Sequence, residues 1–100
     1  MSEHATISTD VLATYAADAA REVDGIAGLV DGVFPRQRGV RVTDEDGRIT
    51  VELHVSARWG VAIPTAARAV QEHVAEYLGR MADVQPASVA VVVDEIGPPP

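Results

Sequence analysis

The stretch VRVTDEDGRITVELHVSA, at residues 40–57, decides the fold. From residue 49 to residue 58 apolar and polar residues alternate strictly, which is typical of a strand with one buried face and one face in water. Val40 and Val42 alternate in the same way ahead of Asp46-Gly47, a dipeptide that favours a tight hairpin turn. The stretch therefore predicts a β-hairpin whose polar face is left to solvent or to a partner.

Two helical patterns flank this hairpin. Before it, apolar residues recur three and four positions apart, and residues 8–10, Ser-Thr-Asp, are types that cap a helix N-terminus. Gly25 is the expected stop of this helix. After the hairpin, an apolar stripe runs from Ile63 to Met81, and Pro64 suits a first helical turn because its missing N–H costs little there.

A second stripe of the first helical pattern consists of alanine, at Ala13, Ala17 and Ala20. Alanine favours helix, so an exposed alanine face is tolerated. The alternative interpretation is close contact with another helix or another subunit. We favour the exposed face, because small apolar patches are normal on monomeric proteins.

Two further strands complete the predicted set. Residues 26–34 are short and apolar and contain two glycines, which predicts an irregular strand, while the valine-rich alternation at residues 89–94 predicts a final strand. The order is helix, short strand, hairpin, helix, strand. This order predicts an α+β fold, a two-layer sandwich with two helices packed on one face of a small mixed sheet. If the strand ending at Ala57 and the final strand are parallel, their crossover is right-handed.

The pattern predicts a single α+β domain over residues 7–96, and a chain of 100 residues suits one core. Residues 1–6 carry no pattern and are expected to form a flexible N-terminus. Residues 97–100 read Gly-Pro-Pro-Pro, and are expected to form a flexible tail because proline has no N–H to donate.

The charge balance narrows the function. Eight basic residues, all arginine, oppose 15 acidic residues and give a net charge of −7, which argues against nucleic acid and against direct binding to an anionic membrane. The absence of cysteine excludes disulfides and thiolate chemistry. The longest apolar run, residues 89–93, is far short of the roughly 20 residues that span a bilayer. With no signal-peptide pattern at its start, the chain is expected to be cytoplasmic, without direct membrane insertion.

Catalytic patterns are scarce. The three histidines, His4, His54 and His73, share no metal-ligand spacing, so we expect no metal site and no cofactor. Glu52 and His54 share the polar strand face and could act as a base with an orienting carboxylate in a small enzyme. We favour a solvated face instead, because the sequence indicates no pocket that would exclude water. The chain is therefore expected not to be an enzyme.

The remaining candidates are interaction residues. Three arginines at positions 36, 38 and 41 could bind an anion or an acidic partner, although ordinary loop solubility is the favoured interpretation. Trp59 follows the long strand and is either a cap on the edge of the core, which we favour, or an interface anchor. The full set of candidate interaction residues is Arg36, Arg38, Arg41, His54, Arg58 and Trp59.

Three blocks of this chain resemble the alkaline shock protein family of Gram-positive bacteria. The first is an alanine-rich helix followed by Glu-Val-x-Gly-Val-x-Gly, which stands at residues 22–28 as EVDGIAG. The second comprises GVRV at residues 39–42 and ITVELHV at residues 49–55. The third is an aromatic–Gly pair followed by Ile-Pro, at residues 59–64 as WGVAIP, with tryptophan where the family usually has tyrosine.

The resemblance covers about residues 7–96. It implies a non-enzymatic cytoplasmic protein of the cell-envelope stress response, acting as an adaptor or scaffold. It further implies a protein partner, such as a separate membrane anchor protein, and self-association as a homo-oligomer. Other members of the family are linked to acetyl-CoA carboxylase, so regulation of fatty-acid synthesis through protein binding is the alternative.

Overall fold

The computed structural model describes residues 7–32 and 38–99. Its elements, in chain order, are α1 (Thr9–Arg21), β1 (Ile26–Leu29), β2 (Val40–Glu45), β3 (Arg48–Ala57), α2 (Ile63–Ala82) and β4 (Ser88–Ile96). This is the predicted order. The N-terminal residues 1–6 and the candidate Arg36 lie outside the described residues.

The hairpin forms as the alternation predicts. β2 and β3 pair antiparallel from Val40↔Leu53 to Glu45↔Arg48, so the turn consists of Asp46 and Gly47 alone. Both turn residues have positive φ, 55° and 86°, as a two-residue hairpin turn with the right twist requires. The turn is therefore formed by the dipeptide that the sequence predicts.

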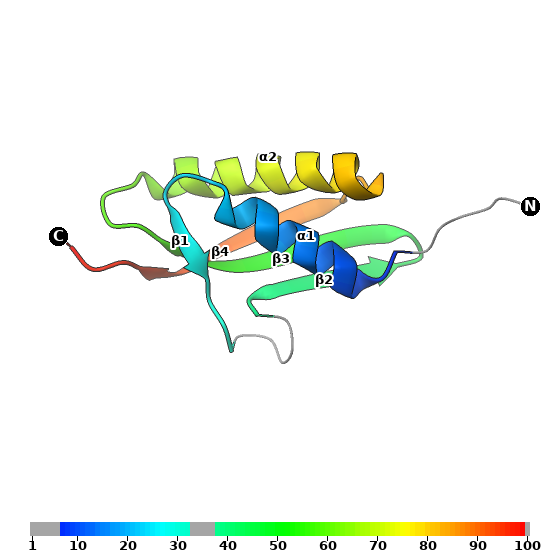
Figure 1. The fold of residues 1–100 in the computed structure, drawn as a ribbon, viewed down its shortest axis with the longest axis horizontal. Helices are drawn as coiled ribbons and strands as arrows, with labels where there is room; N and C mark the ends of the chain where they lie inside the picture. Colours follow the sequence, from blue (N-terminus) through cyan, green and yellow to red (C-terminus); the bar gives the residue numbers. More distant parts are fainter. Residues whose placement is uncertain (1–6, 33–37, 100) are drawn as a thin grey trace, which may run out of the picture.

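β3 is the centre of the sheet. On one side it pairs antiparallel with β2 and, further along, with β1, and on the other side it pairs parallel with β4. The sheet is therefore mixed, and the parallel pair encloses α2 as the crossover. Figure 1 shows both helices on the same side of this sheet, with α1 crossing β2 and α2 running along the β4 side. The predicted two-layer α+β sandwich is confirmed.

The first helix differs from prediction in two ways. Its N-cap is Ser8, whose side chain accepts a hydrogen bond from the Val11 amide, but the helix ends at Arg21 and not near Gly25. Gly25 instead has a φ of +91° in the turn that leads into β1. The alanine stripe is also not an exposed face, because Ala17 and Ala20 are buried against the rest of the fold. The preference for an exposed stripe was wrong, since small side chains here allow α1 to pack closely.

The core lies between the sheet and the two helices. Every second residue of β3 from Ile49 to Ala57 is buried, as the alternation predicts. From α2 the core receives Ala66, Val70, Val74 and Leu78, spaced three and four residues apart. Met81, assigned to this stripe from the sequence, is 45% exposed because it lies in the last turn of α2. Neither helix of the described residues covers the opposite face of the sheet, and this open face presents the polar residues of β2, β3 and β4.

Candidate functional site

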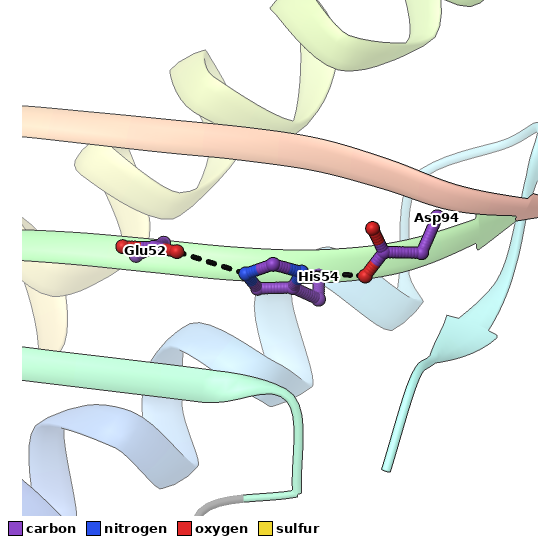
Figure 2. A network of polar contacts seen from close by, with 3 residues as sticks. All are labelled: Glu52, His54 and Asp94. Carbon is purple, nitrogen blue, oxygen red and sulfur yellow. Dashed lines mark hydrogen bonds and ion pairs between the residues drawn. The ribbon is translucent and has the colours of Figure 1, made fainter. Parts of the chain in front are cut away.

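His54 lies at the middle of the open face between two carboxylates (Figure 2). Its Nε2 lies 2.8 Å from Oε2 of Glu52, two residues earlier on β3, and its Nδ1 lies 2.5 Å from Oδ2 of Asp94 on β4. The His54 side chain is only 12% exposed. The predicted solvated histidine is therefore wrong in one respect: the ring is on the open face, but its neighbours enclose it.

The geometry favours the charged form of His54. Both ring nitrogens face carboxylate oxygens, and both can donate only when the ring is the doubly protonated imidazolium. Partial burial acts to lower the pKa of His54, but its hydrogen bonds to Glu52 and Asp94 and their negative charges outweigh that, so the pKa lies above the ordinary 6.5.

Asp94 joins the cluster through the pairing of β3 with β4. Val92 is the register partner of His54 on the open face, and Asp94, two residues later, faces the same side by alternation. The register then shifts, so that Ser56 pairs with Glu95 and Asp94 is left as the extra residue. Asp94 was not among the candidate interaction residues, although the alternation at residues 89–94 places it on the same face of its strand as Val92.

The other predicted interaction residues surround this cluster only in part. Arg41 on β2 lies directly opposite Glu52 in the register of the open face. Arg38 and Arg58 are exposed, before β2 and after β3. Trp59 is 56% exposed, so the favoured interpretation as a cap on the core edge was wrong. The interpretation as an interface anchor remains a prediction.

His73 is also placed by a carboxylate. It lies on α2, and its Nε2 is 2.7 Å from Oε1 of Glu22, just beyond the end of α1. The neighbouring Tyr77 packs edge-on against Tyr15 of α1, with ring centroids 6.0 Å apart. These contacts join the two helices, which gives His73 a structural role.

The described residues offer little for catalysis. One apolar depression of about 310 Å³ lies between the end of α1 and the start of α2, away from His54. Its lining is Val23, Asp24, Val61, Ala62, Thr65, Ala66 and Ala69. Within residues 7–32 and 38–99, no group of three or more histidine, cysteine, aspartate and glutamate residues is placed to hold a metal ion.

A family model for the alkaline shock protein 23 family, described as having a cell envelope-related function, matches residues 1–98. The chain belongs to this family. YqhY of Bacillus subtilis (strain 168), an uncharacterized protein, is 34% identical over 85 residues, which is 75% of this chain and 63% of YqhY. The chain thus spans less than two thirds of the length of that relative.

Solved structures add a likeness of fold. One MamM C-terminal domain variant is similar with a TM-score of 0.61 at 15% identity, covering 91% of this chain and 100% of the domain. A cadmium form of another variant has a TM-score of 0.59 at 15% identity, covering 88% of this chain and 98% of that domain. At such low identity, these likenesses show the fold alone.

Proposed function

We propose that this protein is a non-enzymatic adaptor or scaffold of the cell envelope that binds a protein partner through the open face of its sheet. The observation that supports this most is that a model of a family with cell envelope-related function matches residues 1–98. In addition, Glu52, His54 and Asp94 form their network on a sheet face that neither described helix covers, away from the apolar depression. A sheet face with side chains held in place suits recognition of another surface.

The network is suited to recognition because its side chains are already ordered. Glu52, His54 and Asp94 hold one another, so little side-chain freedom is left to lose on binding. Arg41 opposite Glu52 adds positive charge to the same face. A partner with paired basic and acidic groups would match this surface. Neither α1 nor α2, the helices of the described residues, has the length and hydropathy of a membrane span. The partner that we propose is a separate membrane anchor protein.

Site-specific photo-crosslinking in cells tests the proposal. A photoreactive residue replaces Thr43 or Thr50, which pair across β2 and β3 on the open face, and the exposed Glu72 of α2 is the control position. We expect one protein to be captured from both open-face positions and not from position 72. Equal capture at all three positions, or none from the open face, would contradict the proposal.

The identity of the captured protein separates the alternatives. A membrane-anchored protein supports the adaptor role, and a further copy of this chain supports a scaffold built by self-association. A subunit of acetyl-CoA carboxylase would support the alternative, regulation of fatty-acid synthesis through protein binding.

A further inference from the structure

β4 is the outermost described strand on its side of the sheet, and α2 extends past its outer edge. Three strands lie side by side at any point of the sheet, because β1 and β2 share one side of β3. Two helices must cover these three strands, and α2 contacts β4 while α1 contacts β1 and β2 (Figure 1). A helix with its side chains is about 10 Å across, whereas strands are spaced about 4.8 Å apart. A helix packed over β4 therefore extends past it by about the width of one strand.

The burial of β4 agrees with a missing neighbour. Val51, Leu53 and Val55 of β3 face the helices and are 1%, 0% and 0% exposed. Their register partners on β4, the valines at positions 89, 91 and 93, face the same way but are only half-buried. Nothing among the described residues pairs with the outer side of this strand.

The backbone of β4 is set to receive a strand there. The amide of His54 donates to Gly39 and its carbonyl accepts from Val30, so the His54 backbone points towards the β1 and β2 side. By alternation, Leu53 and Val55 point towards β4, and in a parallel pair they bond to the residues on either side of their register partners. The amide and carbonyl groups of Ala90 and Val92 are thus used internally.

The groups left over point outwards. They are the amides and carbonyls of the three valines at positions 89, 91 and 93. The Val89 carbonyl already accepts a hydrogen bond from Gln71 of α2, at 3.0 Å, which places that flank of the helix directly above the edge. Neither proline nor lysine, two residues that protect edge strands, occurs between Ser88 and Ile96, and the bulge at Asp94 lies beyond the three valines.

Charge favours a basic occupant. Glu95 pairs in register with Ser56 and lies next to Asp94, so two carboxylates stand together at the end of the edge. Asp94 is held by His54, whereas Glu95 is exposed, and the whole chain carries a net charge of −7. A second copy of this chain would bring like charge and its own α2 to the same space.

We propose that the outer edge of β4, beneath α2, binds an extended segment of a partner protein as an added strand, with apolar residues at alternate positions and a basic residue beside Glu95. The inference rests on the proposed adaptor role, because the occupant is another protein. The edge of β4 is a different surface from the open face, however. Capture from Thr43 or Thr50 would therefore neither require nor prove binding at the edge.

Amide hydrogen exchange on the full-length, isotope-labelled protein tests the edge directly. The probe is a blocked nine-residue peptide in which valine alternates with threonine and one end carries two arginines. We expect the edge amides of the three valines to exchange fast in the free protein and at least about tenfold more slowly with saturating peptide, as for newly formed hydrogen bonds. The internal amides of Ala90 and Val92 should not change.

Two control peptides and two variants sharpen the test. A peptide of the same composition with its valines grouped together should not bind. Val91→Pro removes an outward donor, along with the packing of the half-buried Val91 side chain, and should weaken binding about tenfold or more, the loss expected for one or two hydrogen bonds. Glu95→Arg should weaken binding of the arginine-ended peptide and strengthen binding of a glutamate-ended one. This comparison does not depend on whether the Val91→Pro variant folds.

Three results would overturn the inference. Edge amides already protected in the free protein would show an occupant from this chain, with concentration dependence marking a second copy. If the peptide with grouped valines bound as tightly as the alternating one, the peptide would not be binding as an added strand. Unchanged binding to both variants would show that the peptide binds away from the edge of β4. In each of these cases, a partner captured from Thr43 on the open face would still support the proposed function.

Discussion

At the scale of single residues, His54 links the stability of the fold to pH. Its ring donates to both Glu52 and Asp94 only as an imidazolium, since both carboxylates are acceptors. A neutral ring keeps one of the two hydrogen bonds and places a lone pair against the other carboxylate.

The direction of the pH effect follows from the raised pKa of His54. The unfolded pKa is near 6.5 and the folded pKa lies above it, so the folded state binds the proton more tightly. The stabilisation is fully present below about pH 6.5 and is lost as pH rises through the folded value. Urea unfolding from pH 6 to pH 9 should show a falling free energy of unfolding in this window, and His54→Gln should flatten that fall. An unchanged fall in His54→Gln would show that other groups cause it.

Gly39 shows a different constraint at the same scale. Its φ is +86°, and a Cβ placed there would lie 2.6 Å from the carbonyl oxygen of Val30. Gly47 in the hairpin turn has the same φ, with nothing within 4 Å of such a Cβ. Gly39→Ala therefore combines backbone strain with a steric clash, while Gly47→Ala has the strain alone.

We expect Gly39→Ala to lower the free energy of unfolding by about 2–4 kcal/mol, and Gly47→Ala by about 1 kcal/mol. Chemical denaturation of the two variants beside the parent protein checks the difference. Equal losses would mean that the loop before β2 can shift to accommodate the new methyl group.

At the scale of elements, α1 packs through alanine because its inner face approaches both the sheet and α2. Ala16, Ala19 and Ala20 are 0% exposed. Such a face tolerates no added volume, because interiors are packed as densely as crystals. The alanine pattern that looks permissive in the sequence is thus a requirement of the packing.

Ala20→Leu should lower the free energy of unfolding by about 1–3 kcal/mol through overpacking. Val11→Leu on the same helix is the matched control, since Val11 is 42% exposed, and should change stability by less than about 0.5 kcal/mol. Thermal or urea unfolding measures both. A tolerated Ala20→Leu would show that α1 can move away from its neighbours.

At the scale of the whole molecule, β3 ties the fold together. It pairs with each of the other three strands, and its buried residues face both helices. Opening β3 therefore requires every other strand to separate. On the outer side of the edge strand β4, by contrast, no described strand pairs with it.

Native-state hydrogen exchange should follow this hierarchy. The amides of β3 should exchange only through global unfolding, with the same denaturant dependence as the unfolding transition itself. The amides at the ends of α1 should exchange through smaller openings. If β3 amides exchanged by several independent local openings, the sheet would not be the cooperative unit that its pairing indicates.

Much of the fold was predictable because its signals are local. The ten-residue alternation, the Asp46-Gly47 turn, the Ser8 cap and Pro64 in the first turn of α2 each act within a few residues of chain. Two of the three residues of the candidate site were predictable for the same reason, since Glu52 and His54 are two positions apart on one strand.

What the sequence alone determined is therefore the set of elements, their order and the existence of a polar sheet face. The tertiary structure decided what depends on register between distant segments. Only the parallel pairing of β3 with β4, which sets His54 opposite Val92, brings Asp94 to His54 across 40 residues of chain. It also decided that the alanines of α1 are buried and Trp59 is exposed. A residue's type fixes which contacts it can make, but the packing of whole elements fixes which of them it meets.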